Sequence, residues 1–407
     1  MPGRLVMDQL KVLFITNWYP TAEEPAKAVW VREHARAARI YDEVVVLHCI
    51  ESDRNLRSRW ILTPESDQAL SDGIPTYRLR YRRSRFQHAS YLVYVWALFG
   101  AFRRLVQHGF RPDVIHVHIY DAGWPAVLIG QLYRIPVVVS EHFSSFPRRV
   151  LGRLDICKAW LAFRLANRVL PVSASLQRAI ERYGIRSRFQ VVPNAVDTAL
   201  FSPATPRRTE ADLKRLLFVG QLVPVKGVPY LLHALSGLRR TREDWHLDVV
   251  GDGDKRMEYE QLAVDLKLCD KVTFHGLKSK PEVAEFMRRA DVFVLPSLSE
   301  TFSVPVAEAL ATGLPIVATR CGGPEEFVVQ NVGLIVPRGD AESLRGGIES
   351  MLDNLHRYSC AEIAQYAKER FSLEVVGASL HGVYESVRGE VRPARKSGTT
   401  ASPGAGG

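Results

Sequence analysis

The sequence is poor in cysteine and has no long apolar run. Its five cysteines are widely separated, without a Cys-x-x-Cys pair or a cluster with histidine, so we expect free thiols in a reducing cytosol and neither a disulfide frame nor a zinc site. The longest apolar stretch, Ala89 to Phe102, is shorter than the roughly 18–20 residues that span a bilayer. The N-terminus lacks the layout of a signal peptide, and we therefore expect a soluble, cytoplasmic protein.

Basic residues outnumber acidic residues only in the first half of the chain. Residues 1–195 contain 28 Lys and Arg against 16 Asp and Glu, a net charge of +12, whereas residues 196–407 contain 26 against 28, a net charge of −2. A basic half of this kind favours an acidic partner, such as phosphates, nucleic acid or an anionic membrane. The alternative is a charged surface that only keeps the protein dissolved.

Length and composition are those of a globular protein with two domains. The chain has 407 residues, of which 46% are hydrophobic and 24% charged, and this suits two domains of roughly 180–200 residues. Short runs of Val, Ile and Leu alternate with amphipathic stretches, a pattern typical of parallel strands covered by helices on both faces. We predict strands at residues 11–17, 43–50, 113–118, 136–142, 168–173 and 190–194, and then at 216–222, 246–253, 271–276, 291–297, 315–320 and 333–337.

This alternation occurs twice and predicts an α/β fold of two doubly wound, Rossmann-like domains that face a central cleft. We place the first domain at residues 1–200 and the second at 213–372, joined by a linker at 201–212 that is rich in Pro, Thr and Arg. We expect a helix at 373–390 that crosses back to the first domain, followed by a disordered tail at 391–407. Because open α/β sheets bind ligands at the carboxyl ends of their strands, the cleft is the predicted site.

Residues 296–326 contain the strongest functional signal. A predicted strand ends shortly before Glu300, and Ser303 suits the N-cap of a helix that starts at Val304 and carries Glu308. The free N–H groups at the start of that helix would bind a diphosphate. Glu300 could accept hydrogen bonds from sugar hydroxyls, and Glu308 from the two hydroxyls of a ribose. The segment therefore predicts a site for a sugar nucleotide.

The two glutamates also allow simpler interpretations. Glu300 could be a partner of the helix dipole, and Glu308 could lie on a solvated helix face. Apolar residues surround Glu308 in the sequence, however, and an unpaired carboxylate would be costly there, which favours a ligand. After the next predicted strand, Gly322 and Gly323 would let the backbone approach a ligand closely.

The Glu300-x7-Glu308 spacing, with Pro296-Ser297 before it, resembles the retaining glycosyltransferases of family four, which have the GT-B fold. The resemblance covers nearly the whole chain, because further motifs of that family follow in the expected order. These motifs are VVPNAVDTALFSP at 191–203, VGQLVPVKG at 219–227, VVGDGD at 249–254, VTFHG at 272–276 and ADVFVLPS at 290–297.

The resemblance implies roles for individual residues. Lys226 would neutralise the leaving diphosphate, Glu300 would bind the transferred sugar, and Glu308 the donor ribose. His142 would contact the donor sugar or the acceptor as the new bond forms. The alternative is a buried histidine whose ring nitrogens form hydrogen bonds within the protein. The other expected donor-binding residues are Gly220, Gln221, Gly251, Ser303, Val304, Gly322 and Gly323, and the expected acceptor-side residues are Asn17 and His118.

Only one of two histidines in a first-domain strand is expected to reach the cleft. His116 and His118 alternate with a valine, and we expect one ring on each side of the strand. His118 is nearer the carboxyl end of the strand and is the better candidate. A purely structural role for His118 remains the alternative.

The sequence departs from the family pattern at three places. Gln221 stands where the phosphate loop usually carries arginine, so part of the neutralising charge must come from elsewhere. Thr301-Phe302-Ser303 replaces the usual glycines near Glu300, and the loop after the first strand lacks the usual Gly-Gly. These changes leave the identity of the donor open.

The family implies a retaining reaction without a cofactor or a required metal. No carboxylate pair of the glycosidase kind is evident, so the leaving phosphate oxygen would itself take the acceptor proton. Asp252-Gly253-Asp254 matches the metal-binding motif of another glycosyltransferase fold, but it lies in a glycine-rich turn that the resemblance places near the nucleotide. The expected partners are a nucleotide-diphosphate sugar and a glycan or lipid-linked acceptor, in polysaccharide or glycolipid synthesis by analogy.

The basic segment at residues 77–107 keeps other classes of function open. Its arginines interleave with aromatic residues, as in a nucleic-acid surface or a face that rests on an anionic membrane. We favour a peripheral membrane contact over nucleic acid, and the alternative is a helix packed on its own sheet. A degenerate GT-B binding protein or a GT-B epimerase shares the predicted architecture.

Overall fold

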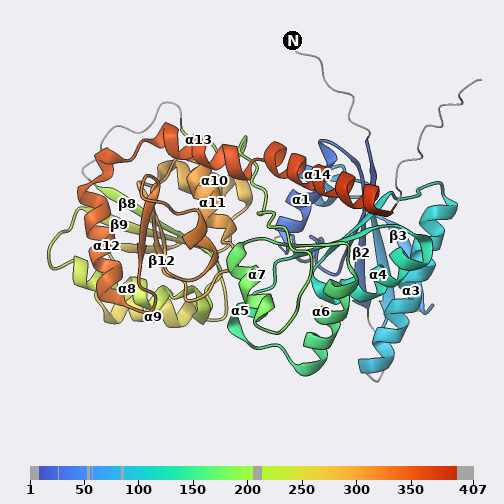
Figure 1. Cartoon of the computed structure of the whole chain (residues 1–407). Helices are drawn as coiled ribbons and strands as arrows, with labels where there is room; N and C mark the ends of the chain where they lie inside the picture. Colours follow the sequence, from blue (N-terminus) through green and yellow to red (C-terminus); the bar gives the residue numbers. More distant parts are fainter. Residues whose placement is uncertain are drawn as a thin grey trace, which may run out of the picture.

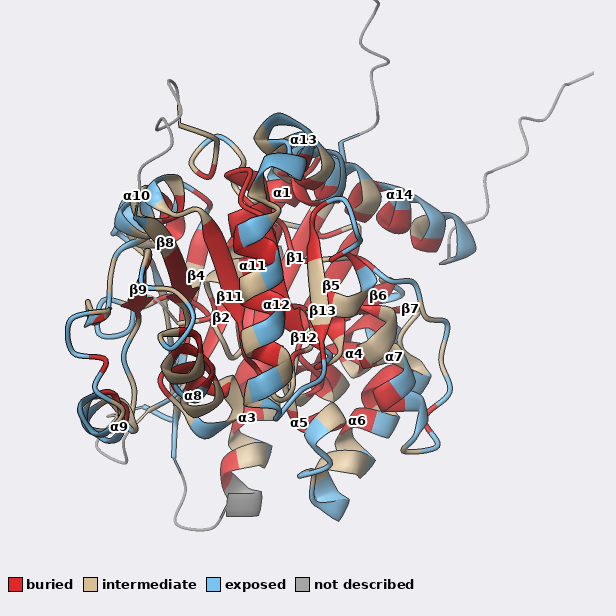
Figure 2. Cartoon of the chain, turned by 90° about the vertical axis from the view of Figure 1, so that its left-hand side faces the viewer, coloured by how far each residue is buried: buried red, intermediate tan, exposed pale blue. Residues whose placement is uncertain are grey.

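The computed structural model describes residues 9–25, 27–52, 56, 58–83, 87–204 and 213–391. Two doubly wound α/β domains lie side by side, which confirms the predicted fold class (Figure 1). Buried strands lie between helices whose outer faces are exposed (Figure 2). The predicted tail lies outside the described residues except for Val391, which ends the last helix.

The first domain contains a seven-stranded sheet in the order β3-β4-β2-β1-β5-β6-β7, parallel except for β3. The strands are β1 Lys11–Thr16, β2 Glu43–Ser52, β3 Trp60–Pro64, β4 Thr76–Arg82, β5 Val114–His118, β6 Val137–Glu141 and β7 Arg168–Pro171. The helices are α1 Val29–Arg39, α2 Gln68–Ser71, α3 Gln87–Gln107, α4 Tyr120–Tyr133, α5 Ser145–Arg148, α6 Arg153–Leu165 and α7 Ala174–Glu181.

The second domain contains a fully parallel sheet in the order β10-β9-β8-β11-β12-β13. The strands are β8 Lys214–Val219, β9 Trp245–Val250, β10 Val272–Phe274, β11 Val292–Leu295, β12 Ile316–Thr319 and β13 Gly333–Val336. The helices are α8 Val228–Leu238, α9 Arg256–Asp265, α10 Lys280–Arg289, α11 Val304–Ala311, α12 Ala341–Asp353 and α13 Cys360–Phe371, with 3₁₀ turns η1 Pro224–Lys226, η2 Gly323–Glu326 and η3 Leu355–Arg357.

The last helix returns to the first domain. Helix α14, Leu373–Val391, packs along α1 (Figure 1). His381 Nδ1 lies 2.8 Å from Asp42 Oδ1, and both residues are buried. The C-terminal segment therefore covers the first domain with specific polar contacts.

One predicted strand is absent, and two strands of the first sheet, β3 and β4, were not predicted. Residues 190–194 form no strand, and Pro193 lacks the N–H that a ladder needs. Residues 76–82, which include the start of the basic segment at 77–107, form β4, and β4 pairs with β3. Arg80 and Arg82 are exposed, because β4 lies near the sheet edge, where part of one face reaches solvent, whereas Arg78 is buried and pairs with Glu65 at 2.7 Å.

None of the helices in the described residues is long and apolar enough to cross a membrane.

Candidate active site

The structure brings Lys226 and Glu300 together, although 74 positions separate them in the sequence. Lys226 ends η1, after β8, and Glu300 lies in the loop after the neighbouring β11. Lys226 Nζ donates to Glu300 Oε1 at 2.7 Å, and Ser297 Oγ donates to the same oxygen at 2.7 Å. The Glu300 side chain is buried, so it holds the lysine ammonium at the carboxyl ends of two adjacent strands.

Ser303 precedes α11, but its predicted capping role was wrong. The hydroxyl makes no capping hydrogen bond, because the backbone is left-handed, with φ 73° and ψ 82°, and not extended as at a serine cap. The buried Ser303 Oγ has no hydrogen-bond partner within the described chain. The positive end of α11, from Val304 on, is therefore not capped by this side chain and can attract an anion.

Glu308 is buried on α11 and faces the first domain. Lys280 Nζ, at the start of α10, lies 3.8 Å from Glu308 Oε1 and 3.0 Å from Glu33 Oε1 of α1. Burial raises the pKa of Glu308 to about 7; Lys280 opposes this shift and Glu33 reinforces it. The carboxylate thus has a cationic neighbour that the sequence analysis missed, and Lys280 links the two domains.

The predicted donor glycines have packing reasons of their own. Gly322 has φ 121°, and a Cβ there would crowd the carbonyl oxygen of Glu300. A Cβ at Gly323 would overlap the carbonyl of Thr301. Both glycines therefore let the backbone approach the Glu300 loop, whereas we had expected them to let it approach a ligand. Gln221 is exposed in the loop after β8.

The expectation that His116 and His118 point to opposite sides was wrong. Their ring centroids are 4.4 Å apart, because residues two apart on a strand share one face. His116 Nδ1 lies 2.6 Å from the Tyr384 hydroxyl of α14, and Nε2 lies 2.7 Å from Ser140 Oγ. Both ring nitrogens of His116 are satisfied, and this histidine is structural.

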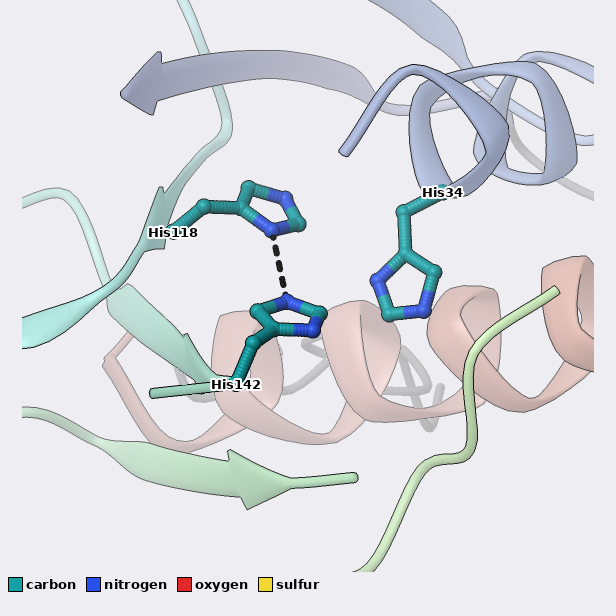
Figure 3. Close-up of side chains that lie close together, drawn as sticks. All are labelled: His34, His118 and His142. Atoms are coloured by element: carbon teal, nitrogen blue, oxygen red, sulfur yellow. Dashed lines mark hydrogen bonds between the residues drawn. The ribbon is translucent and has the colours of Figure 1, made fainter. Parts of the chain in front are cut away.

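His118 and His142 meet at the ends of β5 and β6. His118 Nδ1 and His142 Nε2 are 3.2 Å apart, and His34 of α1, which the sequence analysis missed, completes a group of three rings (Figure 3). Burial lowers the pKa of His34 to about 4 and the pKa values of His118 and His142 well below the ordinary range, and the mutual repulsion of the rings adds to the shifts at His118 and His142. All three imidazoles are therefore neutral at neutral pH.

Glu141 fixes the turn that carries His142. Its carboxylate accepts hydrogen bonds from the backbone N–H groups of His142 at 2.9 Å, Phe143 at 2.8 Å and Tyr120 at 3.0 Å. Burial raises the pKa of Glu141 to about 7, although these three hydrogen bonds oppose the shift. The side chain ties β6 to the start of α4.

Asn17 lies directly after β1, on the same sheet edge as the histidines. Its Nδ2 donates to Asp121 Oδ2 of α4 at 3.3 Å, and Asp121 also lies 3.5 Å from Lys158 Nζ. The buried Asn17 Oδ1 has no partner among the described residues. This polar atom is available to a ligand.

Comparison with protein families identifies the chain. The family described as Glycosyl transferases group 1 matches residues 205–370, and the family described as Glycosyltransferase Family 4 matches residues 43–200. The chain is a family 4 glycosyltransferase. A glycogen synthase of Mycobacterium tuberculosis is 30% identical over 298 residues, which span 70% of this chain and 71% of that protein. A D-inositol 3-phosphate glycosyltransferase of Pseudarthrobacter chlorophenolicus is 30% identical over 62% of this chain and 65% of its own length.

Solved structures with the GT-B fold match almost the whole glycosyltransferase. Anabaena HepE, in complex with UDP and glucose, superposes with a TM-score of 0.72 at 22% identity and covers 93% of this chain and 100% of its own. Sucrose-phosphate synthase from Thermosynechococcus elongatus gives 0.71 at 19% identity, over 93% of this chain and 99% of its own. The architecture is therefore GT-B.

The two domains of this glycosyltransferase touch around the candidate site. Glu326, at the end of η2, accepts hydrogen bonds from the backbone N–H groups of Ala174 at 2.8 Å and Ser175 at 2.5 Å, at the start of α7. The Thr301 hydroxyl donates to the carbonyl oxygen of His142 at 3.1 Å. These contacts, together with the Lys280–Glu33 ion pair, hold the Glu300 loop against the histidine group.

Proposed function

We propose that this glycosyltransferase retains anomeric configuration and moves a hexose-type sugar from a nucleotide-diphosphate donor to an acceptor hydroxyl. The observation that carries the proposal is the 2.7 Å Lys226–Glu300 pair beside the open end of α11. In this arrangement Lys226 and the helix terminus stabilise the diphosphate, Glu300 accepts hydrogen bonds from the transferred sugar, and Glu308 accepts them from the ribose.

The reaction needs few catalytic groups in this scheme. The acceptor oxygen attacks the anomeric carbon as the bond to the phosphate oxygen breaks, and that oxygen takes the acceptor proton. The protein positions the reactants and stabilises the departing charge. We propose that no metal serves the diphosphate, since Asp252 pairs with Arg256 at 3.1 Å and accepts from the Gly253 N–H at 2.8 Å.

A thermal-shift screen with UDP, GDP, ADP and their sugar conjugates tests the donor site. A ligand at 100 times its Kd adds about 2.7 kcal/mol of stability, which raises Tm measurably. We expect one nucleotide series to stabilise the wild type and not Glu308→Ala or Lys226→Ala. UDP is the first to test, because HepE was solved with UDP and glucose. Stabilisation of all three proteins alike would place binding elsewhere, and NMR of the product anomer tests retention.

Donor affinity should depend on pH through Glu308. Ribose hydroxyls donate to the ionised carboxylate, so binding favours deprotonation, and affinity should rise as pH rises through about 7, the pKa of Glu308 before binding. We would measure the Kd of the stabilising nucleotide sugar by calorimetry from about pH 5.5 to pH 8.5, because a nucleotide sugar has no terminal phosphate that titrates there. Glu308→Gln should bind more weakly, with a flat profile. An equal slope in this variant would assign the titration to another group.

We propose that the acceptor is a glycan or a glycolipid and that the first domain docks on an anionic membrane. Helices α3, α4 and α6 lie side by side on one face (Figure 1). A surface hollow of 640 Å³ between α3 and the end of α4 is lined by Leu92, Trp96 and Leu132 together with Arg103 and Arg104. Exposed apolar groups beside arginines match the acyl boundary and the head groups of anionic lipid.

Co-sedimentation with vesicles tests this contact. We expect binding to vesicles of phosphatidylcholine that contain phosphatidylglycerol, and weak binding to phosphatidylcholine alone. Leu92→Ser should weaken binding about tenfold, since burying a leucine is worth roughly 1.5–3 kcal/mol. Leu277→Ser is the matched control, because Leu92 and Leu277 are both 68% exposed but Leu277 belongs to the second domain. Equal effects of the two substitutions would contradict a specific membrane face.

A further inference from the structure

Three imidazoles converge in the first domain from segments far apart in sequence. His34 comes from α1, His118 ends β5 and His142 follows β6, and each offers a ligand atom within 4.8 Å of the other two (Figure 3). The three ring centroids lie 5.3, 5.5 and 5.5 Å apart, a nearly equilateral arrangement. Within the described chain, this is the one group of three or more His, Cys, Asp or Glu residues so placed.

Each of these rings has a buried nitrogen without a partner. His34 Nδ1, His118 Nε2 and His142 Nδ1 make no hydrogen bond to any described residue. A buried polar atom left unsatisfied costs roughly 1–3 kcal/mol. Of these atoms, His34 Nδ1 faces the other two rings (Figure 3), so the group has one unsatisfied nitrogen on the side where the rings meet, whereas the nearby His116 has both nitrogens satisfied.

A hydrogen bond to the backbone orients the His34 ring for coordination. His34 Nε2 lies 3.0 Å from the carbonyl oxygen of Pro193 and must donate to it, which leaves the lone pair on Nδ1, facing the other two rings in Figure 3. A carbonyl on the far nitrogen is the usual support of a histidine that binds a metal. His142 Nε2 lies 3.2 Å from His118 Nδ1 and is therefore the nitrogen of His142 that faces the group.

The separation of His118 and His142 fits a metal ion. In a tetrahedral zinc site with Zn–N bonds of about 2.0–2.1 Å, neighbouring ligand nitrogens are about 3.3–3.4 Å apart. His118 Nδ1 and His142 Nε2 are already 3.2 Å apart. One edge of the coordination tetrahedron is thus present, and a small adjustment of His34 Nδ1 would complete the face.

We propose that His34, His118 and His142 bind a divalent transition metal, zinc in the first instance, through His34 Nδ1, His118 Nδ1 and His142 Nε2. Imidazole ligands favour zinc over magnesium or calcium, which prefer oxygen. The fourth position is left to water or to a hydroxyl of a bound molecule. The ion joins α1 to the ends of β5 and β6 and so anchors the acceptor side of the cleft.

The test uses the full chain, purified without a polyhistidine tag and dialysed against metal-free buffer. Mass spectrometry should find about one zinc per chain, and cobalt substitution should give the intense visible bands of four-coordinate Co²⁺. His34→Gln should lose both signals. The matched control His116→Gln, two residues from His118, should keep them. Because either variant could fold poorly, circular dichroism is recorded on each, and His246→Gln in the second domain provides another control.

A second measurement covers the case of a poorly folded variant. A chelator should lower the Tm of the wild type, and added zinc should restore it, because an ion that binds only the folded state stabilises it. The proposal is overturned if the folded wild type takes up neither zinc nor cobalt, or if folded His34→Gln retains the wild-type amount. If the wild type takes up no metal but still binds the nucleotide, this site is overturned and the transferase proposal stands.

Discussion

Replacing Lys226 with alanine is expected to lower kcat by about a hundredfold to a thousandfold, the range found when one preorganised charge-stabilising group is removed from an active site. Lys226 is held by Glu300 at 2.7 Å, and the family arginine is replaced here by the uncharged Gln221. The remaining cation therefore carries a larger share of the diphosphate charge. The measurement is a steady-state assay of nucleotide release with the donor that the thermal-shift screen identifies.

Two variants distinguish this effect from a general loss of charge. Lys255→Ala removes a partly exposed lysine that pairs with Glu258 at 2.5 Å, within the same helical turn, and should leave kcat unchanged. Lys226→Arg keeps the charge and should retain part of the rate, although the two cations differ in shape. If Lys226→Ala keeps kcat within about threefold of the wild type, another cation stabilises the leaving group.

Replacing Gly251 with alanine should destabilise the second domain by about 2–6 kcal/mol. Gly251 has φ 135°, a conformation that only glycine adopts without strain, and a Cβ there would overlap the carbonyl oxygen of Gly220. Backbone strain of about 1–3 kcal/mol and overpacking of similar size both apply. Denaturant unfolding should show a lower midpoint, and because the loop after β8 must move, nucleotide binding should weaken as well.

Gly346→Ala is the matched control for the same chemical change. Gly346 lies inside α12, and nothing would lie within 4 Å of an added Cβ. Alanine favours a helix interior over glycine by roughly 0.5–1 kcal/mol, so this variant should be slightly more stable than the wild type. A similar stability for the two variants would show that the turn at Gly251 relaxes freely.

The sequence by itself determined the architecture and the family. Buried parallel strands are nearly continuous apolar runs, so their positions can be read locally, and twelve such runs predicted two doubly wound domains. Glu300 and Glu308 could be singled out as candidate donor-binding residues because they lie on one loop and the helix that follows it. Local spacing alone places Glu300 just before α11 and Glu308 one turn inside it.

Edge strands and backbone geometry were harder to predict. β4, which pairs with β3 near the sheet edge, contains no long apolar run, because arginines occupy alternate positions in it. Ser303 matches the residue preference of a cap, but its left-handed backbone is set by the loop that connects Glu300 to α11. A residue preference describes an average environment, and here the surrounding loop decided the conformation.

Only the tertiary structure decided which distant residues meet. Lys280 joins Glu33 to Glu308 across the two domains, and no periodicity links positions so far apart in the chain. His34 and His118 lie on different elements, and their meeting depends on how α1 packs against the sheet. Buried charge and buried imidazole nitrogen must find partners wherever the fold supplies them. For this reason, long-range packing determined the electrostatics of the cleft.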